Sequence, residues 1–466
     1  MMDYVSTRGG APDLGFCEAL LAGLARDGGL YVPRRWPSFS AAEIRAMRGL
    51  SYPDLAVRLL TPFVGDEIEH ETFARIVREA YATFRHDAVC PIVQTGPNSF
   101  MLELFHGPTL AFKDVAMQLL ARLMDHVLAQ QGRRATIAGA TSGDTGGAAI
   151  EAFGGRERTD IFILFPHGRV SPVQQRQMTT SKASNVHTLA IEGDFDDCQA
   201  LVKDMFNDHA FRDRVALAGV NSINWARIMA QIVYYFSSAL SLGAPDRPVS
   251  FTVPTGNFGD IFAGYAAKRM GLPIERLVIA TNDNDILART LATGTYETRG
   301  VVETTSPSMD IQVSSNFERL LFEAAGRDAA TVRRYMESLK QAGGFTLDAD
   351  VLEAIRREFS AGRSSIEEVG ATIRDTLSRT GLVIDPHTAA GVHVARANAS
   401  ASTPMVVLST AHPAKFPAAV EAACGISPVL PDWLGDLMMR EEKFTVLPSE
   451  LKMVEDHIDR HARTVL

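Results

Sequence analysis

Short apolar or β-branched runs alternate with amphipathic segments from about residue 100 onward, and this alternation restricts the fold more than any other feature of the sequence. Helical periodicity follows many of the runs. The pattern is typical of βα units, in which parallel strands form a sheet that helices cover on both faces. We therefore expect an α/β protein with largely parallel sheets. The runs are Ala135–Ala138, Ile161–Phe165, Val186–Ile191, Val215–Val220, Val249–Val253, Leu277–Ala280 and Met405–Leu408.

The rest of the sequence divides the chain into regions. Helix-period patterns dominate the beginning, for example over 41–60 and 72–84, and we expect them to be broken at Pro53 and Pro62. Between 313 and 380 only helical patterns occur, which predicts a helical insertion. We expect the two α/β lobes to be discontinuous in sequence. The expected regions are a mainly helical N-terminal domain at 1–95, a first α/β lobe at 96–245 and a second α/β lobe at 246–466.

Composition excludes several classes of function. The net charge of −9 and the pI of about 5.8 leave no basic field for nucleic acid or an anionic membrane surface. The apolar runs are far shorter than the roughly 20 residues of a membrane span, and the first residues lack a signal-peptide pattern, so we expect a cytoplasmic protein. No cysteine or histidine pair has metal spacing; we interpret His387 and His393 as structural and expect no metal. The four cysteines are widely spaced, and we expect them to be reduced; they are Cys17, Cys90, Cys198 and Cys424.

A strand, a glycine-containing loop and a helix follow one another over 249–268. Gly256 and Gly259 permit backbone angles that turn successive N–H groups inward on an anion at a helix N-terminus. No Lys or Arg occurs from 249 to 267, so a phosphate here would depend on backbone donors and the helix dipole, as suits a resident cofactor better than a nucleotide triphosphate. A tight turn with Asp260 as helix cap is the alternative.

A second loop of this type spans 138–147 and contains three hydroxyl side chains and four glycines before a helix. It predicts another anion site, suited to a carboxylate or a phosphate. The nucleophile elbow of serine hydrolases requires Gly-x-Ser-x-Gly, and Ser142 does not stand in that pattern. Two such loops in one chain suggest that a cofactor and a substrate are held separately.

Lys113 follows Leu110, Ala111 and Phe112 at the start of an amphipathic helix. Burial and the positive end of the helix would both lower the pKa of its amine, which favours the neutral form needed for a Schiff base or for proton abstraction. A surface lysine with a buried stem is the alternative. Two further segments, 221–227 and 406–416, place amides or hydroxyls next to a helix start or a strand end, and either could be a simple cap.

Together these segments resemble the threonine synthase family, in the fold type II group of pyridoxal-phosphate enzymes. The resemblance covers nearly the whole chain, and the helical insertion points to the longer branch, which occurs in bacteria and fungi. It implies two open, largely parallel twisted sheet lobes. The segments that carry it, in the order of the family, are His106–Asp114, Ala140–Gly146, Asn221–Arg227, Val253–Asp260 and Thr410–Phe416, with Tyr4–Gly9 and Asp27–Pro33 near the N-terminus.

The resemblance also implies roles for individual residues. Lys113 would form the Schiff base with pyridoxal 5'-phosphate, and Thr410 would hydrogen-bond the pyridine nitrogen. The short branch has Asn at the position of Asp144, so the contact to the ring hydroxyl is open, with Asn221 or Asn224 as candidates. The cofactor phosphate would lie on Gly256, Asn257, Phe258, Gly259 and Asp260. The substrate carboxylate would lie on Thr141, Ser142, Gly143, Asp144 and Thr145.

The implied reaction converts O-phospho-L-homoserine and water to L-threonine and phosphate by γ-elimination and β-addition, the last step of threonine biosynthesis. Lys113 would remove the protons. We expect a small-molecule substrate, no nucleic acid and no membrane as partners, and a monomer or a homodimer. The cations that could bind the substrate phosphate are Arg169, Arg176, Lys182, Lys415 and His412.

Two alternatives remain open. One is a related pyridoxal-phosphate lyase that turns O-phosphohomoserine or O-phosphothreonine into a 2-oxo acid without adding water. The other is a catalytically silent relative that binds a metabolite or a protein. The presence of Lys113, both glycine loops and Thr410 argues against the silent protein.

Overall fold

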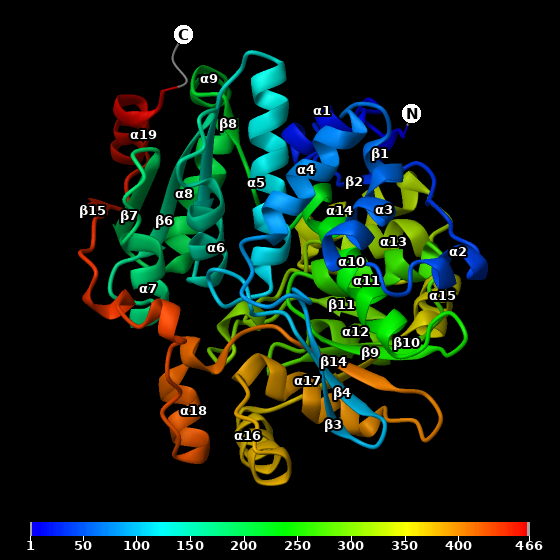
Figure 1. Cartoon of the computed structure of the whole chain (residues 1–466). Coiled ribbons are helices and arrows are strands. Elements are labelled where there is room, and N and C mark those ends of the chain that lie inside the picture. The colour runs from blue at the N-terminus through cyan, green and yellow to red at the C-terminus, as the bar shows by residue number, and fades with distance from the viewer. Residues whose placement is uncertain (1, 464–466) are drawn as a thin grey trace.

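The computed structural model describes residues 2–463, and its larger sheet has six strands in the order β13-β10-β9-β14-β4-β3. All neighbours are parallel except the β3–β4 pair. In Figure 1 this sheet lies at the lower right. Its strands are β3 (Ile92–Gly96), β4 (Ser99–Glu103), β9 (Val249–Pro254), β10 (Ile274–Thr281), β13 (Phe359–Arg363) and β14 (Met405–Ser409).

The smaller sheet is entirely parallel, with the order β15-β7-β6-β5-β8, and lies at the left in Figure 1. Every residue of β6 is buried, as expected for a parallel strand covered on both faces. The expected fold class, two largely parallel sheets with helices around them, is confirmed. The strands are β5 (Ala135–Ala140), β6 (Thr159–Pro166), β7 (Val186–Glu192), β8 (Leu217–Ala218) and β15 (Thr445–Pro448).

A layer of apolar helices joins the two sheets. Within it α6 packs on α5, α5 on α10, and α10 on α11, so one hydrophobic core extends through both lobes. The layer consists of α5 (Lys113–Gln130), α6 (Asp144–Phe153), α10 (Trp225–Ser241) and α11 (Gly259–Arg269). The smaller sheet is also contacted by α7 (Pro172–Thr179), α8 (Phe195–Asn207), α9 (His209–Arg214) and α19 (Leu451–His461), directly or through a neighbouring helix. On the opposite face of the larger sheet, α17 (Pro386–Ala397) packs on β9, β10 and β14, α16 (Ile366–Thr380) packs on α17, and α18 (Pro417–Cys424) packs on α16.

The N-terminal region is mainly helical, with one small antiparallel pair of strands. The expected break at Pro62 is wrong: Pro62 lies inside α3, close to its end at Val64, where a proline removes a single helical hydrogen bond. Pro53 stands in the first turn of α3, where a missing N–H costs nothing. The elements are β1 (Tyr4–Ser6), α1 (Phe16–Ala22), β2 (Tyr31–Pro33), α2 (Ala41–Ala46), α3 (Tyr52–Val64) and α4 (His70–Tyr81).

The segment expected to be purely helical contains strands, so that expectation is wrong. Residues 359–363 form β13, which pairs in parallel with β10 at the edge of the larger sheet. This stretch, Phe-Ser-Ala-Gly-Arg, has little β-propensity of its own, and tertiary pairing overrides it. A second strand, β12 (Gly344–Thr346), pairs with β11 (Thr295–Glu297). Besides α16, the segment contains α13 (Phe317–Ala324), α14 (Ala329–Ala342) and α15 (Ala349–Glu358), and α12 (Ile286–Thr293) precedes it.

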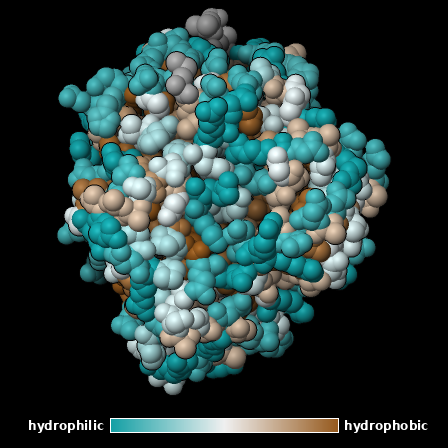
Figure 2. Space-filling view, turned by 90° about the vertical axis from the view of Figure 1, so that its right-hand side faces the viewer, coloured by the Kyte–Doolittle hydropathy of each residue, from teal (hydrophilic) through white to brown (hydrophobic). Residues whose placement is uncertain are grey.

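Hydrophilic residues predominate on the face shown in Figure 2, where hydrophobic residues form small separate areas. Among residues 2–463, no helix combines the length and the apolar character that crossing a membrane requires. The same residues contain no group of His, Cys, Asp and Glu side chains arranged to hold a metal ion. The outer ends of the expected regions, residue 1 and residues 464–466, lie outside the described residues.

Gly264 allows α11 to approach its neighbours closely. A Cβ atom at this position would lie 2.7 Å from Tyr235 Cε1 and 2.9 Å from Leu277 Cδ2. We expect Gly264→Ala to lower the free energy of unfolding by about 1–3 kcal/mol through overpacking. The matched control is Gly370→Ala in α16, where only Arg374 Nη1 comes within 4 Å, at 3.8 Å, and where alanine should stabilise the helix by about 0.5–1 kcal/mol. Denaturant unfolding of both variants measures this, and equal effects would contradict it.

Candidate active site

A cavity of about 2050 Å³ opens where β5, β9 and β14 end. The carboxyl ends of parallel strands are the usual ligand-binding edge of α/β sheets. Of the twelve site residues that the sequence predicts, only Gly143 does not line the cavity. The residues that line it are Lys113, Thr141, Ser142, Asp144, Thr145, Gly256, Asn257, Phe258, Gly259, Asp260 and Thr410.

Lys113 is the first residue of α5, and its side chain is buried. Its Nζ lies 3.4 Å from Asp144 Oδ2 and 3.3 Å from Ser308 Oγ, both long for hydrogen bonds to an ammonium group. Burial lowers the pKa of Lys113, while the Asp144 carboxylate acts in the opposite direction. The amine is therefore loosely held, and burial shifts its protonation equilibrium toward the neutral, nucleophilic form.

Backbone contacts to the end of β14 fix the turn before Lys113. Leu110 adopts a positive φ of 61°, and its carbonyl accepts a hydrogen bond of 3.0 Å from His412 N–H. Phe112 N–H donates to the Thr410 carbonyl at 2.8 Å. The Thr410 side chain is buried, and its hydroxyl bonds to no residue between 2 and 463. Lys113 and Thr410 thus come from distant parts of the chain and face one cavity.

The glycine loop 256–260 presents a row of free backbone donors. Phe258 takes a left-handed conformation with φ 63° and caps α11, which turns the loop inward. No N–H group of residues 256–260 donates a hydrogen bond to any other described residue. The other side of the loop contacts residues 308–316: a Cβ on Gly256 would lie 2.6 Å from the Ser308 carbonyl oxygen. Five successive donors at a helix N-terminus suit a phosphate group.

Asp260 is the acidic member of this loop. Burial raises its pKa to about 7, although hydrogen bonds from Tyr234 and Tyr235 lower it in part. Its Oδ2 atom has no hydrogen-bond partner among the described residues. At pH 7 a carboxyl group with this pKa is about half protonated, so it repels a bound anion less than a fully ionised carboxylate would.

The second loop offers a smaller set of donors. The Thr141 hydroxyl accepts hydrogen bonds of 2.9 Å from both Gly143 N–H and Gly146 N–H, which fixes the turn into α6. The backbone N–H groups of Ser142, Asp144 and Thr145 donate to no other described residue. Three free donors at the start of a ten-residue helix suit a carboxylate.

Asp144 bridges two lysines. Its Oδ1 lies 3.0 Å from Lys415 Nζ and accepts a hydrogen bond of 2.9 Å from Gln174 Nε2, while its Oδ2 faces Lys113. Burial by itself would raise the pKa of Asp144, but Lys415 and Lys113 lower it strongly. Asp144 is therefore a permanent carboxylate in the folded protein.

The five expected phosphate-binding cations have different environments. Only Arg169 lines the cavity, where it is exposed. Arg176 is occupied by an ion pair of 2.7 Å with Glu442, and Lys182 is exposed outside the cavity. Burial lowers the pKa of His412 to about 4, so it is neutral at physiological pH. Lys415 is fully buried and saturated by protein acceptors.

The sequence did not single out Arg227. This residue lies in the first turn of α10, lines the cavity and is 4 % exposed. Its Nη1 donates to the Val220 carbonyl at 3.3 Å, its Nε has no partner, and none of its described contacts is an acidic group. Burial lowers its pKa to about 10, which still leaves the guanidinium charged. A buried cation without a counter-ion suits an anionic ligand. The side chain of the nearby Asn224 is not available to a ligand in this way, because its amide N–H donates to Leu20 O and its oxygen accepts from Ala226 N–H at the start of α10.

His387 also lines the cavity, where the sequence predicted only a structural role. Its Nδ1 is 2.8 Å from Asp385 Oδ1, and its Nε2 accepts a hydrogen bond of 3.3 Å from Ser308 N–H. The histidine thus supports the segment whose Ser308 hydroxyl meets Lys113. The segment Asp385-Pro-His387 resembles an ordinary helix start, so no sequence signal reveals this contact.

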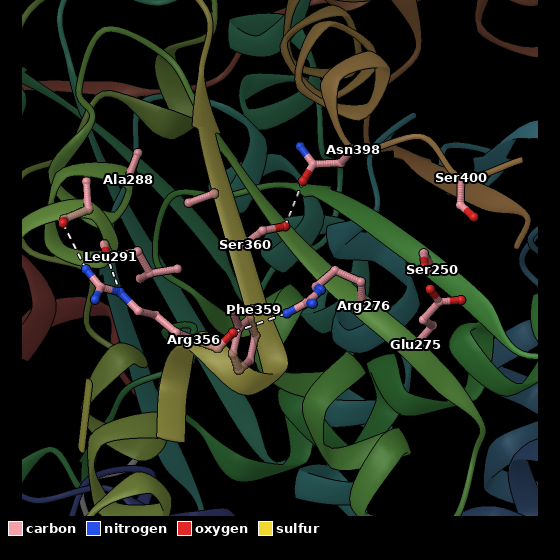
Figure 3. A pocket seen from close by; sticks show the side chains of 12 residues that line it. Ser250, Glu275, Arg276, Ala288, Leu291, Arg356, Phe359, Ser360, Asn398 and Ser400 are labelled. Atoms are coloured by element: carbon pink, nitrogen blue, oxygen red, sulfur yellow. Dashed lines mark hydrogen bonds between the residues drawn. The ribbon is translucent and has the colours of Figure 1, made fainter. Parts of the chain in front are cut away.

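A second hollow, of about 470 Å³, lies at the opposite, amino-terminal end of the larger sheet (Figure 3). Its two arginines already serve the fold: Arg356 donates to the carbonyls of Leu291 and Ala292, and Arg276 donates to the Arg356 carbonyl. We assign no chemistry to this hollow.

The main cavity fits pyridoxal phosphate, which carries a phosphate and an aldehyde that condenses with an amine. The backbone donors of 256–260 fit the phosphate, and Lys113 fits the aldehyde. Residues 94–410 match the model of the pyridoxal-phosphate-dependent enzymes, and the chain belongs to that class. Residues 3–81 and 388–458 match the models of the threonine synthase N terminus and C-terminal part.

Relatives narrow the class to one family. Threonine synthase of Pseudomonas aeruginosa is 54% identical over 99% of this chain and 98% of its own. The crystal structure of pyridoxal-phosphate-bound threonine synthase from Brucella melitensis is 72% identical, with a TM-score of 0.98 over 99% of this chain and 100% of that chain. The yeast threonine synthase structure is 41% identical, with a TM-score of 0.94 over 98% of both chains. The chain belongs to the threonine synthase family.

Asp260 gives a prediction about pH. Its pKa is about 7 in the folded protein against an ordinary 3.8, so between these values the folded state keeps a proton that the unfolded chain has lost. The contribution of Asp260 to the free energy of unfolding should therefore fall as the pH rises from about 4 to about 7. We expect Asp260→Asn to reduce this fall. Denaturant midpoints of the cofactor-free full chain between pH 5 and 7.5 measure it.

The control is Asp436→Asn on the surface. The hydrogen bond from Arg440 lowers the pKa of Asp436, so its contribution to stability is lost only at lower pH. This variant should keep the wild-type slope. An identical slope in Asp260→Asn and wild type would disprove the assignment for Asp260.

Proposed function

We propose that this chain converts O-phospho-L-homoserine and water to L-threonine and phosphate. The observation that carries the proposal is the meeting of Lys113 with the five free backbone donors of 256–260 in one cavity, in a member of the threonine synthase family. A lysine and a phosphate site so placed serve to hold one cofactor by both of its ends.

In this proposal Lys113 Nζ carries the cofactor, residues 256–260 bind its phosphate and the Thr410 hydroxyl contacts its ring nitrogen. When bound, pyridoxal phosphate withdraws electrons from an attached amino acid and makes the protons on its α and β carbons acidic. A hydroxyl at Thr410 does not hold the ring nitrogen protonated, in contrast to a carboxylate. Proton removal then depends more heavily on the base.

Lys113 is that base. Its amine lies at the N-terminus of α5, where burial shifts it toward the neutral form that can accept a proton from the substrate. The long contacts of Nζ to Asp144 and Ser308 leave it free to move between the α and β positions. Each of the two glycine loops binds a different anion in this proposal. Residues 256–260 bind the cofactor phosphate, and the N–H groups of Ser142, Asp144 and Thr145 bind the substrate carboxylate.

We assign the substrate phosphate to Arg227, together with Arg169 at the cavity wall. Arg227 is buried and lacks a carboxylate partner, so a dianionic phosphate would supply the missing counter-charge. Arg169 is exposed and can approach when substrate enters. The same pair would attract the phosphate product.

The enzyme acts in the cytoplasm as a monomer or homodimer in this proposal. All four cysteines are free, which suits a reducing compartment. The reaction needs only a small-molecule substrate, and every group assigned to it comes from one chain.

Lys113→Ala tests the assignment of the base. We expect the variant to lose the visible absorbance of covalently bound cofactor and to release threonine and phosphate at least about 100-fold more slowly, because acid–base catalysis contributes this much or more. The control is Lys268→Met, which removes an ion pair with Glu358 outside the cavity. Wild-type turnover in Lys113→Ala would exclude this mechanism.

Substrate and product are tested with the wild-type protein. We expect threonine and phosphate in equal amounts from O-phospho-L-homoserine, and slower reaction with O-phospho-L-threonine and O-phospho-L-serine. Formation of a 2-oxo acid and ammonia in place of threonine would instead identify the phospho-lyase.

Arg227→Met should raise the KM for the phosphorylated substrate about 10- to 100-fold, because a charge-assisted contact is lost, while the cofactor stays attached. Arg227→Lys should recover part of the loss. The control, Lys452→Met, removes an exposed ion pair with Asp456 on α19. If Arg227→Met instead loses the cofactor at unchanged KM, the guanidinium serves the cofactor phosphate and this assignment is wrong.

A further inference from the structure

Lys415 lies next to the reactive lysine, and the roles proposed above give it no task. Its side chain is completely buried. Its Nζ is 2.7 Å from Thr109 O, 2.9 Å from Gln177 Oε1 and 3.0 Å from Asp144 Oδ1. Three acceptors use all three protons of an ammonium group. Lys415 therefore has no free donor for a ligand, and what it acts on is Asp144.

The contacts of Asp144 are unequal at its two oxygens. Oδ1 has the short contacts, to Lys415 and to Gln174 Nε2 at 2.9 Å. Oδ2 has the long ones, 3.4 Å to Lys113 Nζ and 3.3 Å to Ser308 Oγ. An ammonium and a carboxylate that pair alone approach to about 2.7–2.9 Å. Lys415 and Gln174 hold the carboxylate back from such an approach to Lys113.

We propose that Lys415 is a positioning residue, which keeps Asp144 paired at Oδ1 and so prevents it from fixing Lys113 as a protonated ion-pair partner. The proposal deepens the proposed function and rests on its assignment of Lys113. Lys415 acts through Asp144 and by its own charge. Both effects have the same sign, since each favours loss of a proton from Lys113 Nζ.

Other groups around Lys113 set the background for this effect. Burial, Lys415 and Arg227 lower the pKa of Lys113, and Asp144 raises it. Arg227 and Asp144 are retained when Lys415 is replaced, so the change reports the loss of the Lys415 charge and of its contact with Asp144. The charged and titratable groups that face this cluster are Asp114 on α5, Asp144 on α6, Arg227 on α10, Asp260 on α11, His387 on α17 and His412 after β14.

Lys415→Met should move the proton affinity of Lys113 upward. In the full chain freed of cofactor, the pH midpoint for carbamylation of Lys113 by cyanate, followed by peptide mass spectrometry, should rise by about one unit, so that reaction below the midpoint slows about tenfold. In the loaded enzyme, the pH at which the absorbance of bound cofactor changes should rise as well. Lys415→Arg, which keeps the charge, should stay close to wild type.

Asp144→Asn provides the opposite change. It removes the carboxylate that raises the pKa of Lys113 and leaves Lys415 in place, so the midpoint should fall below that of wild type. This variant keeps the proposal testable if Lys415→Met does not fold. The double variant Asp144→Asn/Lys415→Met removes the pair and should return toward wild type.

Lys268→Met is the matched control, because it removes a lysine ion pair outside the cavity and should shift nothing. A folded Lys415→Met with the wild-type midpoint, or an upward shift in Asp144→Asn, overturns the proposal. Borohydride reduction of the cofactor-loaded wild type distinguishes failure of the proposed function from failure of the role proposed for Lys415. Absence of cofactor on Lys113 would refute the proposed function, whereas the cyanate midpoints would still decide the role of Lys415.

Discussion

Helix N-termini converge on the crevice between the two sheets, and the active site depends on this convergence. Helices α5, α6 and α11 all begin there, because each follows a strand or loop at the carboxyl ends of the parallel strands. Their first N–H groups have no partner within the helix, and their dipoles add positive potential. The protein can therefore bind a cofactor phosphate and a substrate carboxylate with few charged side chains, although its net charge is −9.

The buried charges in the crevice form one connected arrangement. Asp144 is shared by Lys113 and Lys415, and burial raises the pKa of Asp260 to about 7. Arg227 is left without a counter-charge among the described residues. A site with a surplus of buried cations favours anionic ligands, and the looseness of the Lys113 contacts leaves the one reactive amine mobile.

The sequence predicts much of this site because its signals are local. A stretch of ten residues is enough to predict the role of a glycine loop before a helix, such as 256–260. The same holds for a lysine that follows apolar residues, such as Lys113. Lys415, Arg227 and His387 differ, because their roles come from partners 79 or more positions away or from the absence of a partner. Strand β13 was missed for the same reason: only pairing with β10 makes its sequence a strand. The boundaries of the two lobes stay a prediction.

Strand β13 also has a consequence for how the chain avoids self-association. Without it, β10 would expose a row of unpaired backbone groups in an apolar strand, which is a template for intermolecular pairing. The five-residue β13 takes that place and is itself a poor template, because it is short and ends in Gly362 and Arg363. The segment between β10 and α17 thus covers the edge of the larger sheet. A shortened chain that lacks this segment would need another element to cover β10 if it is not to aggregate.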